Sequence, residues 1–396
     1  MDLDVTQPEL AAISRTDSMP GRAILKSKLL WLFFFVFLGF GIYRLQFDLR
    51  SYCLLIRFLN PAASGALLRL ETYAVTTQDI TFPTTSGSIR ARLYLPSGVA
   101  HAPGMVVVHG IHHLGIDEPR LMNFSRAAAG DGFAVLTPEI DALADYHVDA
   151  VSIETIGESS AWLQQRTGTG PVTVVGVSFA GGLSLLAACD PRYASHIREL
   201  VLMGAYDDLG RVSRFLATSQ AELPDGRSIP YVAHDYGAAV FVYSNLEKFF
   251  LASDLEIAHE ALRDWLWEQP KDAEKLLARL SPAGRATMEM LLTRQIYRLR
   301  AQLLEAIRLH ETELAAISPQ GKLGNLHVPV FILHGSTDDI IPSTESLWLQ
   351  REIPARYLRE VLITPAFSHV DPDKKATWRE ELRLVRFLAH VLRDSD

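Results

Sequence analysis

The sequence has few cysteines. Only Cys53 and Cys189 occur in 396 residues, and the sequence contains no CxxC motif and no cysteine and histidine ligand spacing. Two cysteines cannot form a disulfide framework, and a structural zinc site needs several closely spaced ligands. We therefore expect neither a disulfide-stabilised fold nor a zinc-stabilised one. We interpret both residues as ordinary thiols, which leaves the redox compartment open.

Positive charge is not in excess either. The chain carries 38 Lys and Arg residues against 46 Asp and Glu residues, for a formal net charge of -8. Binding to nucleic-acid phosphates needs a basic patch, so nucleic acid is not an expected partner. A composition of 48% hydrophobic and 21% charged residues is typical of a globular protein. The length allows two average domains, or one large domain with an insertion.

One uncharged apolar run precedes the rest of the chain. It extends over about 15 residues, from Leu29 to Tyr43, between Lys28 and Arg44. A bilayer span needs roughly 20 apolar residues, although flanking basic and aromatic side chains extend the reach of a shorter run. The run therefore predicts an uncleaved single-pass membrane anchor. A cleaved signal peptide stays open despite the poor cleavage site after Arg44, and so does a helix buried in the core.

The segments around this run have different characters. Residues 1–28 are predicted to be a polar tail, and residues 29–60 to be the anchor and a juxtamembrane helix. Apolar residues recur with helical spacing from Leu45 to Leu59, before Pro61, so this helix lies in the membrane interface or docks on the globular part. The basic residues on the two sides of the run favour a cytoplasmic N-terminus only by a thin margin, which leaves the side of the main domain uncertain.

From residue 71 on, short apolar strands alternate with helical segments. This alternation is typical of a mostly parallel α/β sheet with both faces covered. A turn with Pro83 and Gly87 joins the first two strands, which predicts an antiparallel hairpin. Eight strands are expected: Glu71–Phe82, Ser88–Leu95, Met105–Val108, Ala134–Pro138, Val172–Val177, Leu200–Met203, Val330–Leu333 and Val361–Ile363. The expected helices include Arg120–Ala129, Ile153–Gln165, Leu183–Ala188 and Trp378–Leu392.

The alternation stops between Gly204 and His327. Over a hundred residues there show no convincing buried strand, and their spacing predicts helices such as Leu255–Trp267 and Ala286–Leu314. A structureless loop of that length is implausible in a compact domain. We therefore expect a helical cap, residues 207–326, inserted into a core. That core would be made of residues 71–206 and 327–396. Most of the cap's aromatic side chains are assigned to its own core, and a few to a pocket.

Ser178 follows a predicted strand and precedes an apolar helix. A nucleophile on a sharp strand-to-helix turn needs small neighbours because the backbone is bent and strained, and Gly176 and Ala180 flank this serine. The N-terminus of the helix also points backbone N–H groups at a developing anion. The pattern predicts a nucleophilic serine, with a serine that caps an ordinary helix as the alternative.

Two further residues follow in chain order. Asp338 lies in the turn after the strand Val330–Leu333, where a carboxylate can orient an imidazole, and its neighbour Asp339 is the alternative. His369 follows the last predicted strand and lies in a loop. The order serine, aspartate, histidine is the one that a triad takes on a sheet of this kind.

Acyl transfer also requires two backbone donors for the oxyanion. Phe179, directly after the serine, would supply one, and Ile111, in the turn after the third strand, would supply the other. The adjacent His112 and His113 suggest a metal, but adjacent histidines point apart in most backbones and no carboxylate pattern accompanies them. Neither a metal site nor a cofactor is predicted.

Residues 71–396 resemble the α/β-hydrolase family. The resemblance rests on the His109-Gly110 turn, the elbow Gly-Val-Ser-Phe-Ala around Ser178, the segment His-Gly-Ser-Thr-Asp-Asp-Ile-Ile-Pro around Asp338, and the Ser-His pair that ends at His369. The central insertion is similar to the cap that many members carry between the sixth and seventh strands. The chain departs from the family at Ala180, because members usually have the second glycine of the elbow at this position. Alanine is small enough that no loss of function is expected.

The resemblance implies a serine hydrolase that cleaves a carboxylic ester or thioester through an acyl-enzyme on Ser178. An acyltransferase, a peptidase and a carbon–carbon bond hydrolase use the same triad and stay open, as does a catalytically silent, membrane-tethered binding protein. A serine nucleophile makes haloalkane dehalogenase and epoxide hydrolase chemistry unexpected. The expected substrate is a small ester, with the apolar run and the aromatic cap as hints of a lipid; the fold does not fix its identity.

Overall fold

A computed structural model describes residues 20–85, 87–367 and 377–395, and it describes no side chains for residues 20–37 and residue 40. The chain separates into two compact units, Met1–Gln46 and Phe47–Asp396. All of the described strands lie in the second unit.

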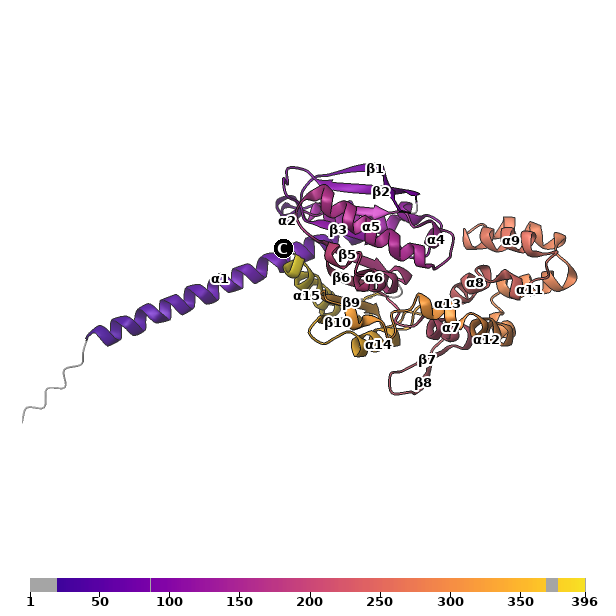
Figure 1. The fold of residues 1–396 in the computed structure, drawn as a ribbon. Coiled ribbons are helices and arrows are strands. Elements are labelled where there is room, and N and C mark those ends of the chain that lie inside the picture. The colour runs from indigo at the N-terminus through magenta and orange to yellow at the C-terminus, as the bar shows by residue number, and fades with distance from the viewer. Residues whose placement is uncertain (1–19, 86, 368–376, 396) are drawn as a thin grey trace, which may run out of the picture. The chain divides into compact units, whose positions relative to one another are not determined.

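Eight strands form one sheet in the order β1-β2-β4-β3-β5-β6-β9-β10 (Figure 1). They are β1 (Val75–Thr84), β2 (Gly87–Pro96), β3 (Gly104–Val108), β4 (Ala134–Pro138), β5 (Val172–Val177), β6 (Ile197–Met203), β9 (Val330–Gly335) and β10 (Leu358–Thr364). Strand β2 pairs antiparallel with β1 and with β4, and every other pair is parallel. The predicted mostly parallel, eight-stranded sheet with an opening hairpin is confirmed.

Alternate residues of the central strands pack on opposite faces of the sheet. In β5, Val174 belongs to one buried cluster and Val175 to the other. The cluster of Val174 includes residues of α5 (Ala150–Thr167) and α6 (Phe179–Cys189), and that of Val175 includes residues of α3 (Pro119–Gly130) and α15 (Trp378–Ser395). Because both faces are covered, the central strands are mostly apolar, which is the feature that predicted a mostly parallel α/β sheet. The remaining core helices are α4 (Asp141–Ala144) and α14 (Thr344–Glu352).

Helix α1 (Pro20–Leu59) begins within the segment predicted as a polar tail and ends, as predicted, before Pro61. Its last turns belong to the larger unit. Phe47, Leu54 and Leu55 are buried in the cluster that also contains α3 and α15. Of the two predicted positions for the segment from Leu45 to Leu59, the structure thus shows docking on the core for the residues from Phe47 onward.

The membrane anchor predicted from Leu29 to Tyr43 is not shown. Most of its side chains lie outside the described residues. Among the described residues, no helix combines the length and apolarity that a bilayer crossing requires. The anchor stays a prediction.

The first strand starts later than predicted. Residues Ala66–Glu71 form a short helix, α2, and β1 begins only at Val75. The buried Leu68 fixes this helix, and the Thr72 hydroxyl donates a hydrogen bond to the Leu68 carbonyl. The predicted strand began too early because the spacing of apolar residues gives no sign that a short helix ends at Glu71.

Between β6 and β9 the chain is mostly helical, as predicted. The helices are α7 (Leu209–Thr218), α8 (Asp235–Tyr243), α9 (Leu255–Leu266), α10 (Pro270–Leu276), α11 (Pro282–Leu292), α12 (Arg300–Leu309) and α13 (Glu311–Ala316). A small hairpin of β7 (Gln220–Glu222) and β8 (Ser228–Pro230) was not predicted, since three-residue strands leave no periodic signal. The single helix predicted over Ala286–Leu314 is wrong. Arg294, with φ +58°, lies between α11 and α12, and His310 separates α12 from α13.

A buried ion cluster links the start of the segment 207–326, which is called the cap here, to α14. Arg211 of α7 donates from Nε to Glu345 of α14 at 2.6 Å and from Nη2 to Asp207 at 2.8 Å. Its guanidinium lies 4.1 Å from the ring centroid of Trp348. Burial raises the pKa of Asp207 to about 7. Because one guanidinium serves two buried carboxylates, α7 is held in a fixed position over the end of β6.

Candidate active site

Ser178 lies at the sharp turn between β5 and α6. It has φ +56° and ψ -127° and is 3% exposed. A non-glycine residue in this region is strained and persists only when its surroundings hold it. Here the Ser178 N–H donates to the Met203 carbonyl of β6 at 2.7 Å, and the Gly181 N–H donates to the Ser178 carbonyl at 2.9 Å. The turn therefore presents the serine in the strained conformation known from nucleophile elbows.

The small neighbours of Ser178 are required by packing. A β-carbon at Gly176 would lie 2.7 Å from the Ser184 hydroxyl oxygen, and one at Gly181 would lie 2.5 Å from the β-carbon of Ala205. Ala180 is fully buried within the cluster on its face of the sheet. Its single methyl group fits there, so the structure accommodates alanine at this elbow position.

The turn after β3 approaches the serine closely. A β-carbon at Gly110 would lie 3.1 Å from the β-carbon of Ser178 and 3.7 Å from its hydroxyl oxygen. Neither the Ile111 N–H nor the Phe179 N–H donates a hydrogen bond to any residue that the structure describes. Both residues line the same cavity as Ser178. Two backbone donors beside a serine hydroxyl are the arrangement that an oxyanion requires.

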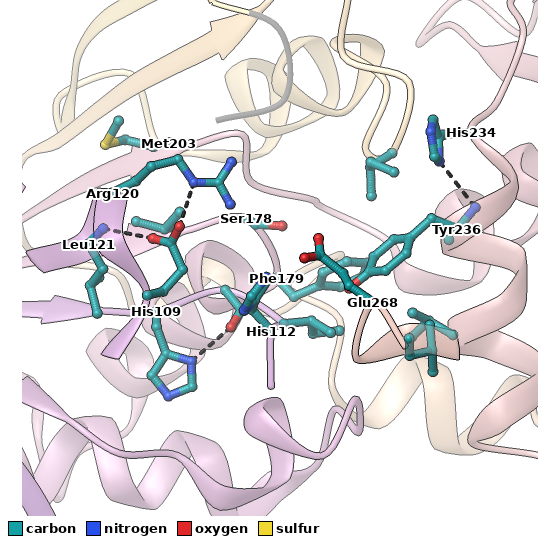
Figure 2. Close-up of a pocket in the computed structure, with 18 of the residues that line it drawn as sticks. His109, His112, Arg120, Leu121, Ser178, Phe179, Met203, His234, Tyr236 and Glu268 are labelled. Carbon is teal, nitrogen blue, oxygen red and sulfur yellow. Dashed lines mark hydrogen bonds and ion pairs between the residues drawn. The ribbon is translucent and has the colours of Figure 1, made fainter. Parts of the chain in front are cut away.

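His109 fixes this turn, a role that the sequence did not indicate. Its Nε2 accepts the Ile140 N–H at 3.0 Å, so Nδ1 carries the proton and donates to the Gly110 carbonyl at 2.8 Å. Burial lowers the pKa of His109 to about 4. The ring points away from Ser178 (Figure 2). It therefore acts as a neutral brace for the backbone around Gly110.

Asp338 follows β9 and is completely buried. Its Oδ1 accepts the Ile340 and Ile341 N–H groups at 3.0 and 2.9 Å, and its Oδ2 lies 3.4 Å from His334 Nε2. Asp339 is partly exposed, and its carbonyl accepts the N–H of a cap residue. The next residue, Ile340, lines the cavity of Ser178. Asp338 is thus the more rigidly held carboxylate of the two.

His369 lies outside the described residues, which stop at Phe367 and resume at Thr377. Strand β10 ends at Thr364, so the histidine does follow the last strand in the chain. Its role in the site stays a prediction.

Ser178 opens into a cavity of about 410 Å³, called here the large cavity. Figure 2 shows Ser178, His112, Tyr236 and Glu268 around it. The lining residues are Val107, His109, Gly110, Ile111, His112, Val177, Ser178, Phe179, Met203 and Ile340 from the core; Phe58, Glu118, Arg120, Leu121 and Phe124 from α1, α3 and the residue before α3; and His234, Tyr236, Gly237, Val240, Trp265, Leu266, Glu268 and Arg294 from the cap. The cap aromatics at the site are therefore Tyr236 and Trp265.

Helix α1 contributes a side chain to the large cavity. Phe58 meets Phe124 of α3 edge to face, with ring centroids 5.7 Å apart, and both rings line the cavity. The sequence placed this helix in a membrane-proximal segment and gave no sign that it reaches the site. Only the fold brings residues so distant in sequence together.

Two charged cap residues at the cavity have left-handed backbones. Glu268 has φ +60° and Arg294 has φ +58°, and both side chains are exposed. Strained non-glycine residues gather at functional sites, and with Ser178 they make three of the five described non-glycine residues with positive φ. The sequence carried no signal for these conformations.

His112 and His113 are arranged differently from the expectation. Their rings stack with centroids 4.6 Å apart instead of pointing apart, and His113 stacks in turn on Trp267. Burial lowers the pKa of both. Within the described ranges, no group of three or more His, Cys, Asp or Glu side chains is placed to hold a metal ion.

A family model described as "alpha/beta hydrolase fold" matches residues 124–372. No curated protein matches the chain.

Several solved structures are similar at low identity. Est1E from Butyrivibrio proteoclasticus is 13% identical over 80% of this chain and 98% of its own, with a TM-score of 0.45. The Pyrobaculum calidifontis esterase is 17% identical over 90% of this chain and 92% of its own, with a TM-score of 0.43. The 2-hydroxy-6-oxo-6-phenylhexa-2,4-dienoate hydrolase of Rhodococcus sp. strain RHA1 is 16% identical over 73% and 91%, with a TM-score of 0.37.

Proposed function

The chain belongs to the alpha/beta hydrolase fold family, and from this premise we propose that it is a serine hydrolase that cleaves a carboxylic ester or thioester through an acyl-enzyme on Ser178. One observation carries the proposal: the strained Ser178 opens into a cavity beside two backbone N–H groups, those of Ile111 and Phe179, that have no described acceptor. A helix-capping serine would need neither the strain nor the paired donors.

In the first half of the proposed reaction, His369 takes the proton of the Ser178 hydroxyl as the oxygen attacks the acyl carbon. The carbonyl oxygen gains negative charge and is held by the Ile111 and Phe179 N–H groups. One such donor is worth about 3–4 kcal/mol of transition-state stabilisation. When the tetrahedral intermediate collapses, His369 returns the proton to the departing alcohol or thiol, and the acyl group remains on Ser178.

In the second half, His369 removes a proton from water as the water attacks the acyl carbon. When the second tetrahedral intermediate collapses, His369 gives this proton to the departing Ser178 oxygen, and the acid is released. Asp338 would orient the imidazole and stabilise its charged form. Two backbone N–H groups and His334 fix that carboxylate, so it is suited to hold a second group in one orientation. The brace at His109 keeps the donor turn in register with Ser178 throughout.

The chain offers a matched pair of variants for the test. Ser178→Ala should lower kcat/KM on small water-soluble esters by at least about four orders of magnitude, because a triad loses most of its rate when its nucleophile is removed. Ser184→Ala, on the same helix, removes a hydroxyl that only donates to the Ala180 carbonyl, and it should keep most of the activity. Purified Ser178→Ala with turnover near wild type would refute the assignment.

We also propose that the chain is attached to a membrane through the run Leu29–Tyr43. The support is the uncharged run between Lys28 and Arg44, together with its position in a 40-residue helix. Fractionation of the full-length chain tests this: it should sediment with membranes and be released by detergent but not by high salt. Recovery in the soluble fraction at full mass would contradict it.

A further inference from the structure

A second cavity lies next to the proposed oxyanion donors. It has a volume of about 210 Å³ and is called here the small cavity. It shares Ile111, Phe179, Gly237 and Val240 with the large cavity, whereas Ser178 lines the large cavity only. The two residues whose N–H groups would hold the carbonyl oxygen therefore border both spaces.

Most of the residues that line the small cavity are apolar. Leu209, Val212 and Leu216 come from α7, Leu314 comes from α13, and Ile317 directly follows that helix. Val212 is fully buried, and Leu209 and Leu216 are less than a tenth exposed. Such a surface favours hydrocarbon over water.

We propose that the small cavity binds the acyl chain of the substrate and that the large cavity binds the alcohol. This assignment rests on the proposed function. From the first attack until water releases the acid, the acyl carbon is bonded to Ser178 beside Ile111 and Phe179. The small cavity borders these two donors but not Ser178, so an acyl chain bound there leaves the cavity at the serine free. The alcohol has to leave and water has to enter. The large cavity, with the exposed charged residues Glu268 and Arg294 in its lining, suits that exchange.

The volume of the small cavity limits the length of the chain. A cavity of about 150 Å³ lined by apolar side chains binds benzene, so about 210 Å³ corresponds to an acyl group of roughly six to eight carbons. Each methylene that is buried raises binding roughly fourfold. Activity should therefore rise with acyl length up to this size and then fall.

Part of the lining of the small cavity is polar, including His310 and Glu313, and this limits the acyl chain chemically as well. His310 Nδ1 lies 2.6 Å from Glu313 Oε2. His310 Nε2 is buried and has no hydrogen-bond partner among the described residues; the nearest recorded carboxylate oxygen, on Glu247, is 4.0 Å away. A hydrocarbon chain beside His310 offers its buried Nε2 no hydrogen bond and separates the Glu313 carboxylate from water, which is unfavourable.

Two substrate series test the proposal on the full-length chain. In one, p-nitrophenyl esters vary in acyl length from two to twelve carbons; in the other, acetate esters vary in the length of the alcohol. Leu314→Trp on α13 and, independently, Ser213→Leu on α7 each place a larger side chain in the small cavity and reduce its free volume. Each should lower the octanoyl-to-acetyl ratio of kcat/KM at least tenfold and leave the alcohol series within about twofold.

A third variant should act in the opposite direction. His310→Leu replaces a polar lining side chain with an apolar one and should move the optimum to longer acyl chains, with at least a threefold rise in the decanoyl-to-octanoyl ratio. Leu309→Trp is the matched control: the side chain is 52% exposed and lines neither cavity, so neither series should change.

The outcomes separate this proposal from the proposed function. If Ser178→Ala still hydrolyses the esters, the proposed function itself fails. If hydrolysis depends on Ser178 but the filling variants change the alcohol series, or change neither series, the acyl assignment is overturned. A shift to shorter acyl chains in Leu314→Trp and Ser213→Leu, with a shift to longer chains in His310→Leu, supports it.

Discussion

Removal of residues 47–67 should unfold the hydrolase core, whereas removal of residues 1–46 should not. The compact larger unit begins at Phe47, and the final turns of α1 pack into it. Because no strand is expected before residue 71, the sequence alone predicts that a chain starting near Leu68 keeps its fold and activity. The structure argues against that start site and favours one at Phe47.

The size of the effect follows from burial. Phe47, Leu54 and Leu55 are 2%, 4% and 5% exposed. Burying each such side chain stabilises the fold by about 1.5–3 kcal/mol, so together they contribute about 5–9 kcal/mol. A whole domain is stable by only about 5–15 kcal/mol. Loss of Arg50, which pairs with the buried Asp131 at 2.9 Å, adds to the deficit.

Urea unfolding of the chains 47–396 and 68–396 measures this difference. The longer chain should unfold cooperatively, and the shorter one should be unfolded or aggregated without denaturant. Two point variants of chain 47–396 give a matched comparison on the same helix. Leu54→Ala should cost about 2–5 kcal/mol. Tyr52→Ala, at a residue 46% exposed, should cost less than about 0.5 kcal/mol. Equal urea midpoints for the two truncated chains would refute the assignment of α1 to the core.

Three further predictions concern the site. Asp338→Asn should lower kcat on the order of 10⁴-fold, as loss of the orienting carboxylate does in a serine protease, while Asp339→Asn should cost far less; the reverse order would shift the assignment by one residue. The rate of hydrolysis should fall on acidification near roughly pH 6.5, because His369 must be neutral to act as a base, and a flat profile between pH 5 and pH 8 would exclude it. Burial lowers the pKa of His109 from 6.5 to about 4. Between these pH values the unfolded chain binds the proton and the folded chain does not. The stability of the fold is therefore unaffected by this group above pH 6.5 and falls as the pH is lowered from 6.5 to 4. Between pH 7 and pH 4.5, the unfolding free energy of His109→Gln should therefore fall by up to about 3 kcal/mol less than that of the wild type.

The sheet was predictable because it is covered on both faces. Strands such as β5 and β9 are mostly apolar, and short apolar runs between helical segments are a clear signal in the sequence. The elbow at Ser178 was predictable for a related reason, since tight packing admits only small residues at Gly176 and Ala180. The strands and the elbow can be predicted from short stretches of sequence because packing around each stretch decides which residue types fit.

The features that were missed depend on distant contacts or on single backbone torsions. Phe58 reaches the large cavity only because α1 docks beside α3. His109 acts as a brace because it accepts the N–H of Ile140, which follows a different strand. Arg294 ends the predicted long helix through a left-handed backbone that arginine rarely adopts. Helical periodicity continues across such a break, so the sequence alone predicted one helix where several occur.

The central claim is that Ser178 is an activated nucleophile, and labelling by a fluorophosphonate tests it most directly. Because the reagent reacts with serines activated by a base, the folded full-length chain should be modified once, and peptide mapping should place the label on Ser178. Ser178→Ala and heat-unfolded wild type should not react under the same conditions. A folded chain that stays unlabelled, or that carries the label on another serine, would contradict the account and favour a binding protein that retains only the fold.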